Sequence, residues 1–371
     1  MASSTPTLLA LPLTAYSSVP TMLISTILYN LAMAAVDVAT LVCLCRRRTP
    51  AAWFQMLAAA GALAVVMAVV FAVGAFGLVW LASFGLFLHA PVLLAGSAVL
   101  LWGKHRKTGV ASAVLCLLLF AVAVDAFLIE PYRLEVSHIE LVSPKITRPV
   151  RIVVLADLQT DRIGDYERAV LRRVMGEDPD VILLAGDYLQ ASGQRLGGLQ
   201  RELNAFLHEI EFAAPDGVYA VAGNVDLGSW PEIFDGLPVT AVKTTESFEA
   251  AGLRWTCLSM RDSGRRSLSI PADNERFHVV LGHRPDFALA GPDADLLVAG
   301  HTHGGQVCLP IIGPLFTASG VPRSWASGVT DLPGGGKLLV SRGVGMERGS
   351  APRLRFLCRP ELVVVDLAPI E

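Results

Sequence analysis

Four long apolar stretches in the first third of the sequence constrain the fold more than any other feature. Each is close to the length of about 20 apolar residues with which a helix crosses a bilayer. They cover residues 22–44, 51–73, 76–102 and 110–127. Hydrophobic residues make up 53% of the chain and charged residues only 17%, an imbalance too large for an ordinary soluble domain. We therefore predict an N-terminal tail over residues 1–20, a four-helix transmembrane region over 21–129 and a separate domain over 130–371.

The basic residues between these stretches predict the orientation of the chain. Three arginines at 46–48 follow the first stretch, and the basic run 104–107 follows the third. Basic loops stay on the cytoplasmic side of a membrane. A cleavable signal peptide fits poorly, because the first twenty residues lack Lys and Arg and several apolar stretches follow. We expect a multi-pass protein of the cell membrane whose second domain is extracytoplasmic.

Three ionisable residues, Asp37, His89 and Asp125, lie in or near the apolar stretches. Ionisable residues inside a membrane can mark a proton or ion pathway, but these three are scattered along the sequence without the paired arrangement that a relay needs. We interpret them as packing or interfacial residues. The membrane region is then expected to anchor the second domain beside a lipid substrate, or to line a route for acyl chains.

Polar residues recur at the ends of five short apolar runs in the second domain. Each run is typical of a strand buried on both faces, and the carboxyl ends of such strands open into loops that can aim side chains at one point. The residues that follow the runs are Asp157, Asp187, Asn224 with Asp226, His283, and His301 with His303. Asp, Asn and His ligands suit Mn²⁺, Zn²⁺ or Fe better than a metal that thiolates select. If two cations share a hydroxide, Asp187 is the natural bridge.

The segments around these runs predict the fold class. Residues 134–141 alternate as a half-buried strand does, and residues 166–175 and 199–212 have the pattern of amphipathic helices. Residues 190–198 and 334–336 read as loops. Strands that alternate with helices predict an α/β fold built as a layered sandwich.

The order of the polar motifs resembles the calcineurin-like metallophosphoesterase superfamily. That family carries Asp-x-His, Gly-Asp, Gly-Asn-His-Asp/Glu, His and Gly-His-x-His. Here the corresponding residues are 157–159, 186–187, 223–226, 282–283 and 300–303, and the resemblance covers roughly residues 150–366. Residues 304–307, 341–345 and 359–361 are similar to the membrane-linked bacterial branch that includes phosphodiesterases and lipid-precursor pyrophosphohydrolases. The resemblance implies an αββα metallophosphoesterase sandwich.

The resemblance also implies a binuclear centre. Asp157, Asp187 and His303 would hold one divalent cation, and Asp187, Asn224, His283 and His301 would hold the other. Mn²⁺ is the expected metal, with Zn²⁺ or Fe as alternatives. A hydroxide between the metals would attack the phosphorus of a phosphodiester or pyrophosphate. The implied catalytic residues are Asp187, Asn224, Asp226 and His301, with Asp226 behind the ligands.

Two residues depart from the family pattern. Gln159 stands where the family has a histidine ligand, so either its amide oxygen binds the first metal or Asp161 takes its place, since residues 157, 159 and 161 would point the same way in an extended segment. Val225 stands where the family has the imidazole assigned as proton donor to the leaving group. General acid catalysis contributes about 10²–10⁴-fold, so we expect a substrate whose leaving group is already a stable anion, or another donor.

The remaining features bound the function. The net charge of −3 and the lack of a basic stripe argue against nucleic acid as a partner. The six cysteines show no Cys-x-x-Cys spacing, and the C-terminal arginines are as consistent with packing as with a phosphate patch. We predict a membrane-anchored phosphoesterase acting on a lipid-linked or nucleotide-linked substrate. The alternatives are a weakly active or inactive metal-binding sensor and a regulated transport component; the oligomeric state stays open.

Overall fold

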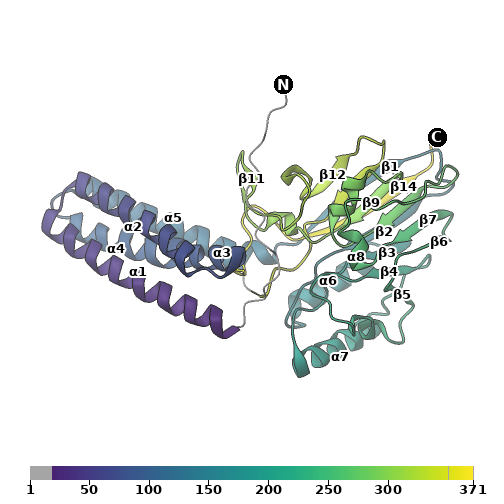
Figure 1. The fold of residues 1–371 in the computed structure, drawn as a ribbon, viewed down its shortest axis with the longest axis horizontal. Coiled ribbons are helices and arrows are strands. Elements are labelled where there is room, and N and C mark those ends of the chain that lie inside the picture. Colours follow the sequence, from purple (N-terminus) through teal and green to yellow (C-terminus); the bar gives the residue numbers. More distant parts are fainter. Residues whose placement is uncertain (1–18, 350, 371) are drawn as a thin grey trace. The chain divides into compact units, whose positions relative to one another are not determined.

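The computed structural model describes residues 19–349 and 351–370. The chain divides into two compact units, shown in Figure 1. One comprises the residues up to Asp125 with Gly349–Arg353, and the other comprises Ala126–Arg348 with Leu354–Glu371. We call them the membrane unit and the catalytic unit and describe each by itself. The predicted tail over residues 1–20 lies almost wholly outside the described residues.

Helices form the whole framework of the membrane unit. The α-helices are α1 (Val19–Arg47), α2 (Pro50–Phe71), α3 (Gly74–Phe84), α4 (Ala90–Leu101) and α5 (Arg106–Val124). A π-helical turn, η1 (Gly85–His89), joins α3 to α4, and a second, η2 (Asp125–Ile129), continues α5. Four segments are long and apolar enough to cross a membrane: Thr21–Arg47, Pro50–Phe71, Gly74–Leu101 and Arg106–Tyr132. The prediction of four apolar N-terminal helices is confirmed.

Two six-stranded sheets and a small hairpin build the catalytic unit (Figure 1). The first sheet has the order β1-β14-β2-β3-β4-β5 and the second β12-β13-β9-β8-β7-β6. Strands of the first sheet are β1 (Glu135–Val142), β2 (Val150–Leu155), β3 (Val181–Leu184), β4 (Val218–Val221), β5 (Val239–Val242) and β14 (Glu361–Ala368). Strands of the second are β6 (Glu246–Ala250), β7 (Leu253–Cys257), β8 (His278–Leu281), β9 (Leu296–Ala299), β12 (Gly328–Asp331) and β13 (Lys337–Val340). The hairpin pairs β10 (Cys308–Leu309) with β11 (Gly313–Pro314).

Apolar side chains hold the two sheets face to face. Ile152 and Leu183 of the first sheet share one buried cluster with Trp255 and Val298 of the second. Helices α6 (Asp165–Met175) and α7 (Gly193–Glu209) cover the outer face of the first sheet, where Phe206 is buried. A smaller cluster with Phe287 from the 3₁₀ helix η5 (Pro285–Ala290) covers the second sheet. Burying each large apolar side chain contributes about 1.5–3 kcal/mol, so the layered αββα sandwich follows from the apolar runs. The predicted fold class is confirmed.

Helix α7 begins earlier than the sequence predicts. The loop prediction for residues 190–198 is wrong beyond Ser192, because the helix starts at Gly193. Leu196 and Leu199 are buried against the first sheet, which outweighs the cost of about 1 kcal/mol for each of Gly197 and Gly198 in a helix. Tertiary packing thus extends a helix that local propensity ends.

Strand direction brings the polar loops to one edge. Strands β2, β3 and β4 are parallel to one another, and so are β13, β9 and β8 in the second sheet. Strand β14 is antiparallel to β2 and parallel to β1, so β1 and β14 begin at the edge where β2 ends. Carboxyl ends of parallel strands are the usual place for a site in α/β proteins.

Candidate metal centre

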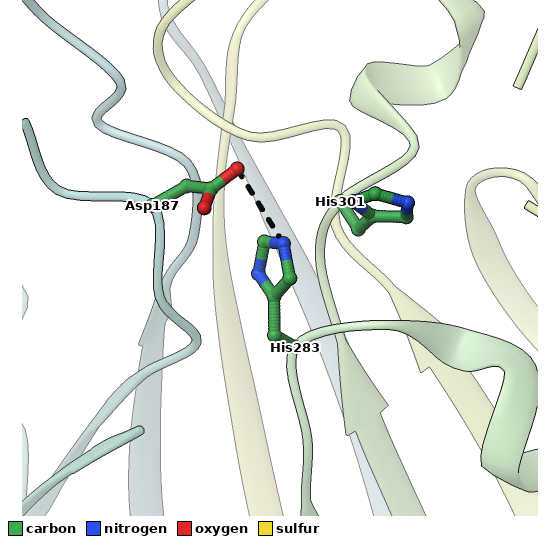
Figure 2. Close-up of side chains that lie close together, drawn as sticks. All are labelled: Asp187, His283 and His301. Atoms are coloured by element: carbon green, nitrogen blue, oxygen red, sulfur yellow. Dashed lines mark ion pairs between the residues drawn. The ribbon is translucent and has the colours of Figure 1, made fainter. Parts of the chain in front are cut away.

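Two groups of candidate ligands converge at this edge and share one carboxylate. Asp187, His283 and His301 each offer a ligand atom within 4.8 Å of the others, and Asp157, Asp187 and His303 do the same. Figure 2 shows the carboxylate of Asp187 directed at the ring of His283, with His301 beside them. The shared residue is the one that the sequence predicts as the bridge. A carboxylate common to two ligand groups is what a pair of neighbouring cations requires.

His283 is fixed with an unprotonated nitrogen toward the site. Its Nδ1 lies 2.8 Å from the carbonyl oxygen of Ala185, which can only accept, so Nδ1 carries the hydrogen. Its Nε2 lies 3.0 Å from Oδ1 of Asn224 and 3.4 Å from Oδ2 of Asp187. Three lone-pair atoms therefore face one another, two on the buried side chains of His283 and Asp187 and one on the exposed Asn224. A backbone carbonyl that orients a ligand histidine in this way is common in metal sites.

Asp157 ties the first sheet to the His301 loop. The backbone N–H of His301 donates to both oxygens of Asp157 at 3.0 Å. The Nε2 of His301 donates to the carbonyl oxygen of Ala318 at 3.1 Å, which leaves its Nδ1 for the site. His303 is buried, and its Nδ1 has no hydrogen-bond partner among the described residues.

Asn224 and Asp226 occupy different places although both follow β4. Asn224 reaches His283, as given above, whereas Asp226 accepts hydrogen bonds from three backbone N–H groups. Its Oδ2 accepts from Asp187 at 2.8 Å and from Gly223 at 2.7 Å, and its Oδ1 accepts from Tyr188 at 2.9 Å. Asp226 thus fixes the two loops that carry Asp187 and Asn224. Val225, between them, is buried and its N–H donates to Oδ1 of Asp187 at 2.9 Å.

Gln159 and Asp161 do not point the same way. Asp157 and Gln159 have φ values of 50° and 31°, so the segment is a turn and the assumption of an extended segment is wrong. Asp161 lies 3.7 Å from Arg195 and 3.8 Å from Arg348, outside both groups of candidate ligands. The backbone N–H of Gln159 donates to the carbonyl oxygen of Asp187 at 2.8 Å, and its side-chain Oε1 is buried without a hydrogen-bond partner. Gln159 is therefore better placed than Asp161 to complete the first metal site with Asp157, Asp187 and His303.

Sequence reasoning missed the group that orients Gln159. Its Nε2 donates to Glu347 at 2.9 Å and to Gln190 at 3.1 Å, so the amide oxygen is directed away from both. Gln190 in turn donates from its own Nε2 to Glu347. No spacing in the sequence links residues 159, 190 and 347. The loops that carry them meet only in the folded unit.

Several site residues adopt strained backbone conformations. Left-handed φ values occur at Asp157, Gln159, Asp187, His301 and His303. Such conformations cost of order 1–3 kcal/mol for residues other than glycine and gather at functional sites. Gly343, with φ of +65°, packs so closely that a Cβ there would lie 2.6 Å from Cβ of Asp157. These strained backbone conformations are what allow the side chains to converge on one site.

Burial sets the protonation of the site. It raises the pKa of Asp187 and of Asp226 to about 7, and raises that of Asp157 well above its ordinary value, with Asp187 adding to the shift. Burial lowers the pKa of His283 to about 4 and of His301 to about 3. The imidazoles are therefore neutral and ready to ligate, while the carboxylates lack a positive partner.

These observations fit a divalent metal centre. Two atoms of the candidate ligands, Oε1 of Gln159 and Nδ1 of His303, are buried without a hydrogen-bond partner in the described part of the chain. Buried carboxylates without a cation are costly, and carboxylate, amide and imidazole ligands together match first-row divalent metals. Bound cations would compensate the buried carboxylates and would also give the unpartnered oxygen and nitrogen atoms a partner.

A buried arginine supports the loop behind the site. Arg355 is fully buried and donates to the carbonyl oxygens of Arg342, Gly343, Gly345 and Cys358. Its guanidinium is therefore used for packing, and Arg342 pairs with Glu361 at 3.0 Å and Glu135 at 3.1 Å. The phosphate-patch interpretation of these two arginines does not hold.

Comparisons with known proteins agree with this geometry. Residues 150–305 match the model of the calcineurin-like phosphoesterase family. The chain is 26% identical over 268 residues to the uncharacterized metallophosphoesterase YkuE of Bacillus subtilis, across 64% of this chain and 87% of that protein. It is 28% identical over 236 residues to the phosphodiesterase YaeI of Escherichia coli, across 59% and 82%. A transmembrane protein with a metallophosphoesterase domain from Danio rerio is 24% identical over 194 residues, across 44% and 42%.

Proposed function

We propose that this chain, whose residues 150–305 match the calcineurin-like phosphoesterase family, is a metal-dependent phosphoester hydrolase that cleaves an activated phosphodiester or pyrophosphate bond at a binuclear centre. The observation that carries the proposal is the pair of ligand groups that share Asp187. When bound, two divalent cations would activate a water for attack on phosphorus and neutralise charge on the phosphoryl oxygens. Mn²⁺ suits the oxygen-rich first group best, with Zn²⁺ or Fe as alternatives.

The residues divide into ligands and supports. Asp157, Gln159, Asp187 and His303 would hold the first metal, and Asp187, Asn224, His283 and His301 the second. Asp226 would keep the loops of Asp187 and Asn224 in register through its three N–H bonds. It would act on catalysis through those loops.

Arg284 is the residue that we assign to substrate binding. It follows His283 directly, and its charge lowers the pKa of both His283 and His301. Its Nε is buried without a hydrogen-bond partner among the described residues, and its ion-pair partner is Oδ2 of Asp286 at 3.7 Å. A guanidinium beside the centre matches the geometry of a phosphate oxygen pair.

The nature of the leaving group follows from Val225. A buried valine at the position beside Asp187 cannot donate a proton. A leaving group that is already a stable anion, such as a nucleoside monophosphate or an aryl oxide, needs little protonation. Pyrophosphate-type bonds are therefore favoured over esters of sugars or glycerol.

The membrane helices favour a substrate at the bilayer. This is a membrane protein by its four apolar helices. The basic residues Arg46–Arg48 lie where span one ends and span two begins, and Lys104–Lys107 lie where span three ends and span four begins. The positive-inside rule then puts both ends of the membrane unit outside the cytoplasm. We assign the catalytic unit to the extracytoplasmic face, with a lipid-linked or nucleotide-linked phosphoester as substrate.

A metal-binding sensor is the second candidate. Gln159 and Val225 are the observations that favour it, because each replaces an imidazole of the family pattern with a weaker or inert group. A sensor would bind metal without turnover.

Hydrolysis of phosphoesters ranked by leaving-group acidity tests the proposal. The full chain in detergent with Mn²⁺ should turn over the activated esters fastest, and Asp187→Asn is the inactive blank. Restoring the donor in Val225→His should raise the rate on poor leaving groups by up to about 10²–10⁴-fold and leave good ones nearly unchanged. Equal gains on both classes would refute the leaving-group argument. Metal content without turnover on any ester would favour the sensor.

A further inference from the structure

The membrane unit contains a buried polar cluster that the fold assembles from two spans. His89 of η1 lies between two residues of α1: its Nδ1 is 2.7 Å from Oδ2 of Asp37, and its Nε2 is 3.0 Å from Oδ1 of Asn30. The side chains of His89 and Asp37 are only 6% and 7% exposed. The expectation that these residues lack a paired arrangement is therefore wrong for Asp37 and His89, because α1 and η1 bring them into contact.

The hydrogen-bond pattern fixes how many protons the cluster holds. Nδ2 of Asn30 donates to the carbonyl oxygen of Thr26 at 2.8 Å, and a carbonyl can only accept, so Oδ1 of Asn30 must face His89. Nε2 of His89 then carries a hydrogen. The short contact between Nδ1 and the carboxylate also needs a hydrogen, because two lone pairs would repel each other. The pair holds one proton between the carboxylate and the second ring nitrogen, and is neutral overall.

The backbone of η1 is adapted to present His89. Residues Gly85–His89 form a π-helical turn inside a membrane span, and such turns occur frequently at functional sites. A Cβ at Gly85 would lie 2.7 Å from the hydroxyl of Tyr29, so this position has room only for glycine. The ring of Tyr29 packs edge-on against His89 with 6.1 Å between ring centroids. Helix α1 and η1 are thus matched at this level of the bundle.

Two polar atoms at this level of the bundle have no hydrogen-bond partner among the described residues: the hydroxyl of Tyr29 and Oδ1 of Asp37. Both atoms are buried. A pair that only cross-links two helices would satisfy both carboxylate oxygens, and a buried ion pair adds little stability compared with apolar packing. Besides the two members of the pair, the titratable group that faces it among the described residues is Tyr29, also from α1. Tyr29 shares a buried apolar cluster with Met33 and Leu81.

We propose that Asp37 and His89 form an intramembrane proton-binding site, which loads and releases one proton through the open Oδ1 of Asp37. In the loaded state the pair is neutral. Release leaves the carboxylate negative and the imidazole neutral, and the proton passes to water or to a proton acceptor that reaches Oδ1. A net charge in an apolar bundle is costly, so the two states favour different packing of α1 against η1. The membrane unit is then a proton-responsive element as well as an anchor.

Infrared difference spectroscopy on the full chain in phosphatidylcholine nanodiscs tests the site. Spectra between about pH 5 and about pH 9 should contain a carboxyl band from one buried acid. We expect this band to be absent in Asp37→Asn and to change its frequency in Asp37→Glu and in His89→Gln. Asp125→Asn is the matched control, because Asp125 is an acid of the same unit outside the cluster, and it should leave the band unchanged.

Identical difference spectra for the native chain and Asp37→Asn would overturn the proposal and leave a static cross-link. If Asp37→Asn fails to fold, the native chain with ¹⁵N-labelled histidine gives the same answer. The His89 signal, assigned by its absence in His89→Gln, should show its Nδ1 resonance changing over this pH range as the shared proton leaves the contact with Asp37. A His89 signal that stays constant throughout would refute the site. Neither result depends on the hydrolase activity.

Discussion

Asp226→Asn should stabilise the metal-free catalytic unit at high pH and destabilise the metal-loaded one. The buried carboxylate has a pKa raised to about 7 by burial and by the neighbouring Asp187. Because this folded-state pKa lies above the ordinary value, the group's contribution to stability is fully present below pH 3.8 and is lost as the pH rises through about 7. The difference between the ordinary pKa of 3.8 and the folded-state pKa of about 7 corresponds to about 4 kcal/mol, at about 1.4 kcal/mol per pH unit.

The opposing cost comes from the hydrogen bonds. Asparagine keeps an oxygen for the N–H groups of Asp187 and Gly223 but turns an NH₂ toward the N–H of Tyr188. One buried donor left without an acceptor costs about 1–3 kcal/mol. In EDTA at about pH 8 the variant should therefore gain about 1–3 kcal/mol, or a melting temperature higher by about 2–10 °C. At about pH 5 most of the gain should vanish.

Saturating Mn²⁺ should reverse the sign of the stability change that Asp226→Asn causes. Cations compensate the carboxylates, so only the lost hydrogen bond remains and the variant should melt at a lower temperature than the native chain. Scanning fluorimetry of both proteins in EDTA and in Mn²⁺, each at the two pH values, measures all four conditions. A variant that melts below the native chain in EDTA at about pH 8 would refute the claim that Asp226 is a destabilising charge in the metal-free state.

Three further substitutions probe other contacts. Gly343→Ala should lose metal and melt at a lower temperature because its Cβ would collide with Asp157, whereas Gly313→Ala, also at positive φ but with no atom within 4 Å, should keep its metal by elemental analysis. Arg284→Gln should raise KM about 10–100-fold through loss of a charged hydrogen bond, with the exposed Arg265→Gln as control; an unchanged KM excludes Arg284 from substrate binding. Arg355→Met should cost at least about 3 kcal/mol, read as a lower melting temperature, because several buried carbonyls lose their donor; native-like stability would contradict that role.

Much of the site could be predicted because its residues follow buried strands. Asp187 and His283 each come directly after such a run, and the parallel direction of the strands brings them to one edge. Local pattern and strand direction together carry this information. The apolar helices could also be predicted from the sequence, because a helix that crosses a bilayer needs a long uninterrupted run of apolar residues.

Contacts between distant loops and helices could not be predicted in this way. Glu347 orients Gln159 across a separation that no periodicity spans, and His89 meets Asp37 only when α1 packs on η1. The start of α7 was missed because the burial of Leu196 outweighs the glycines beside it. In each case the deciding energy comes from packing partners that are far apart in the chain.

The place of β14 bears on how the catalytic unit assembles during synthesis. This strand lies between β1 and β2, although both of its neighbours are translated long before it. Until it arrives, each neighbour exposes an unpaired edge open to mispairing or proteolysis. The start of β14 also supplies Glu361, which accepts hydrogen bonds from Arg342 behind the His303 loop. The candidate ligands should therefore reach their final positions only after β14 has joined the sheet. Metal capture should therefore be a late event that follows the pairing of β14 with β1 and β2.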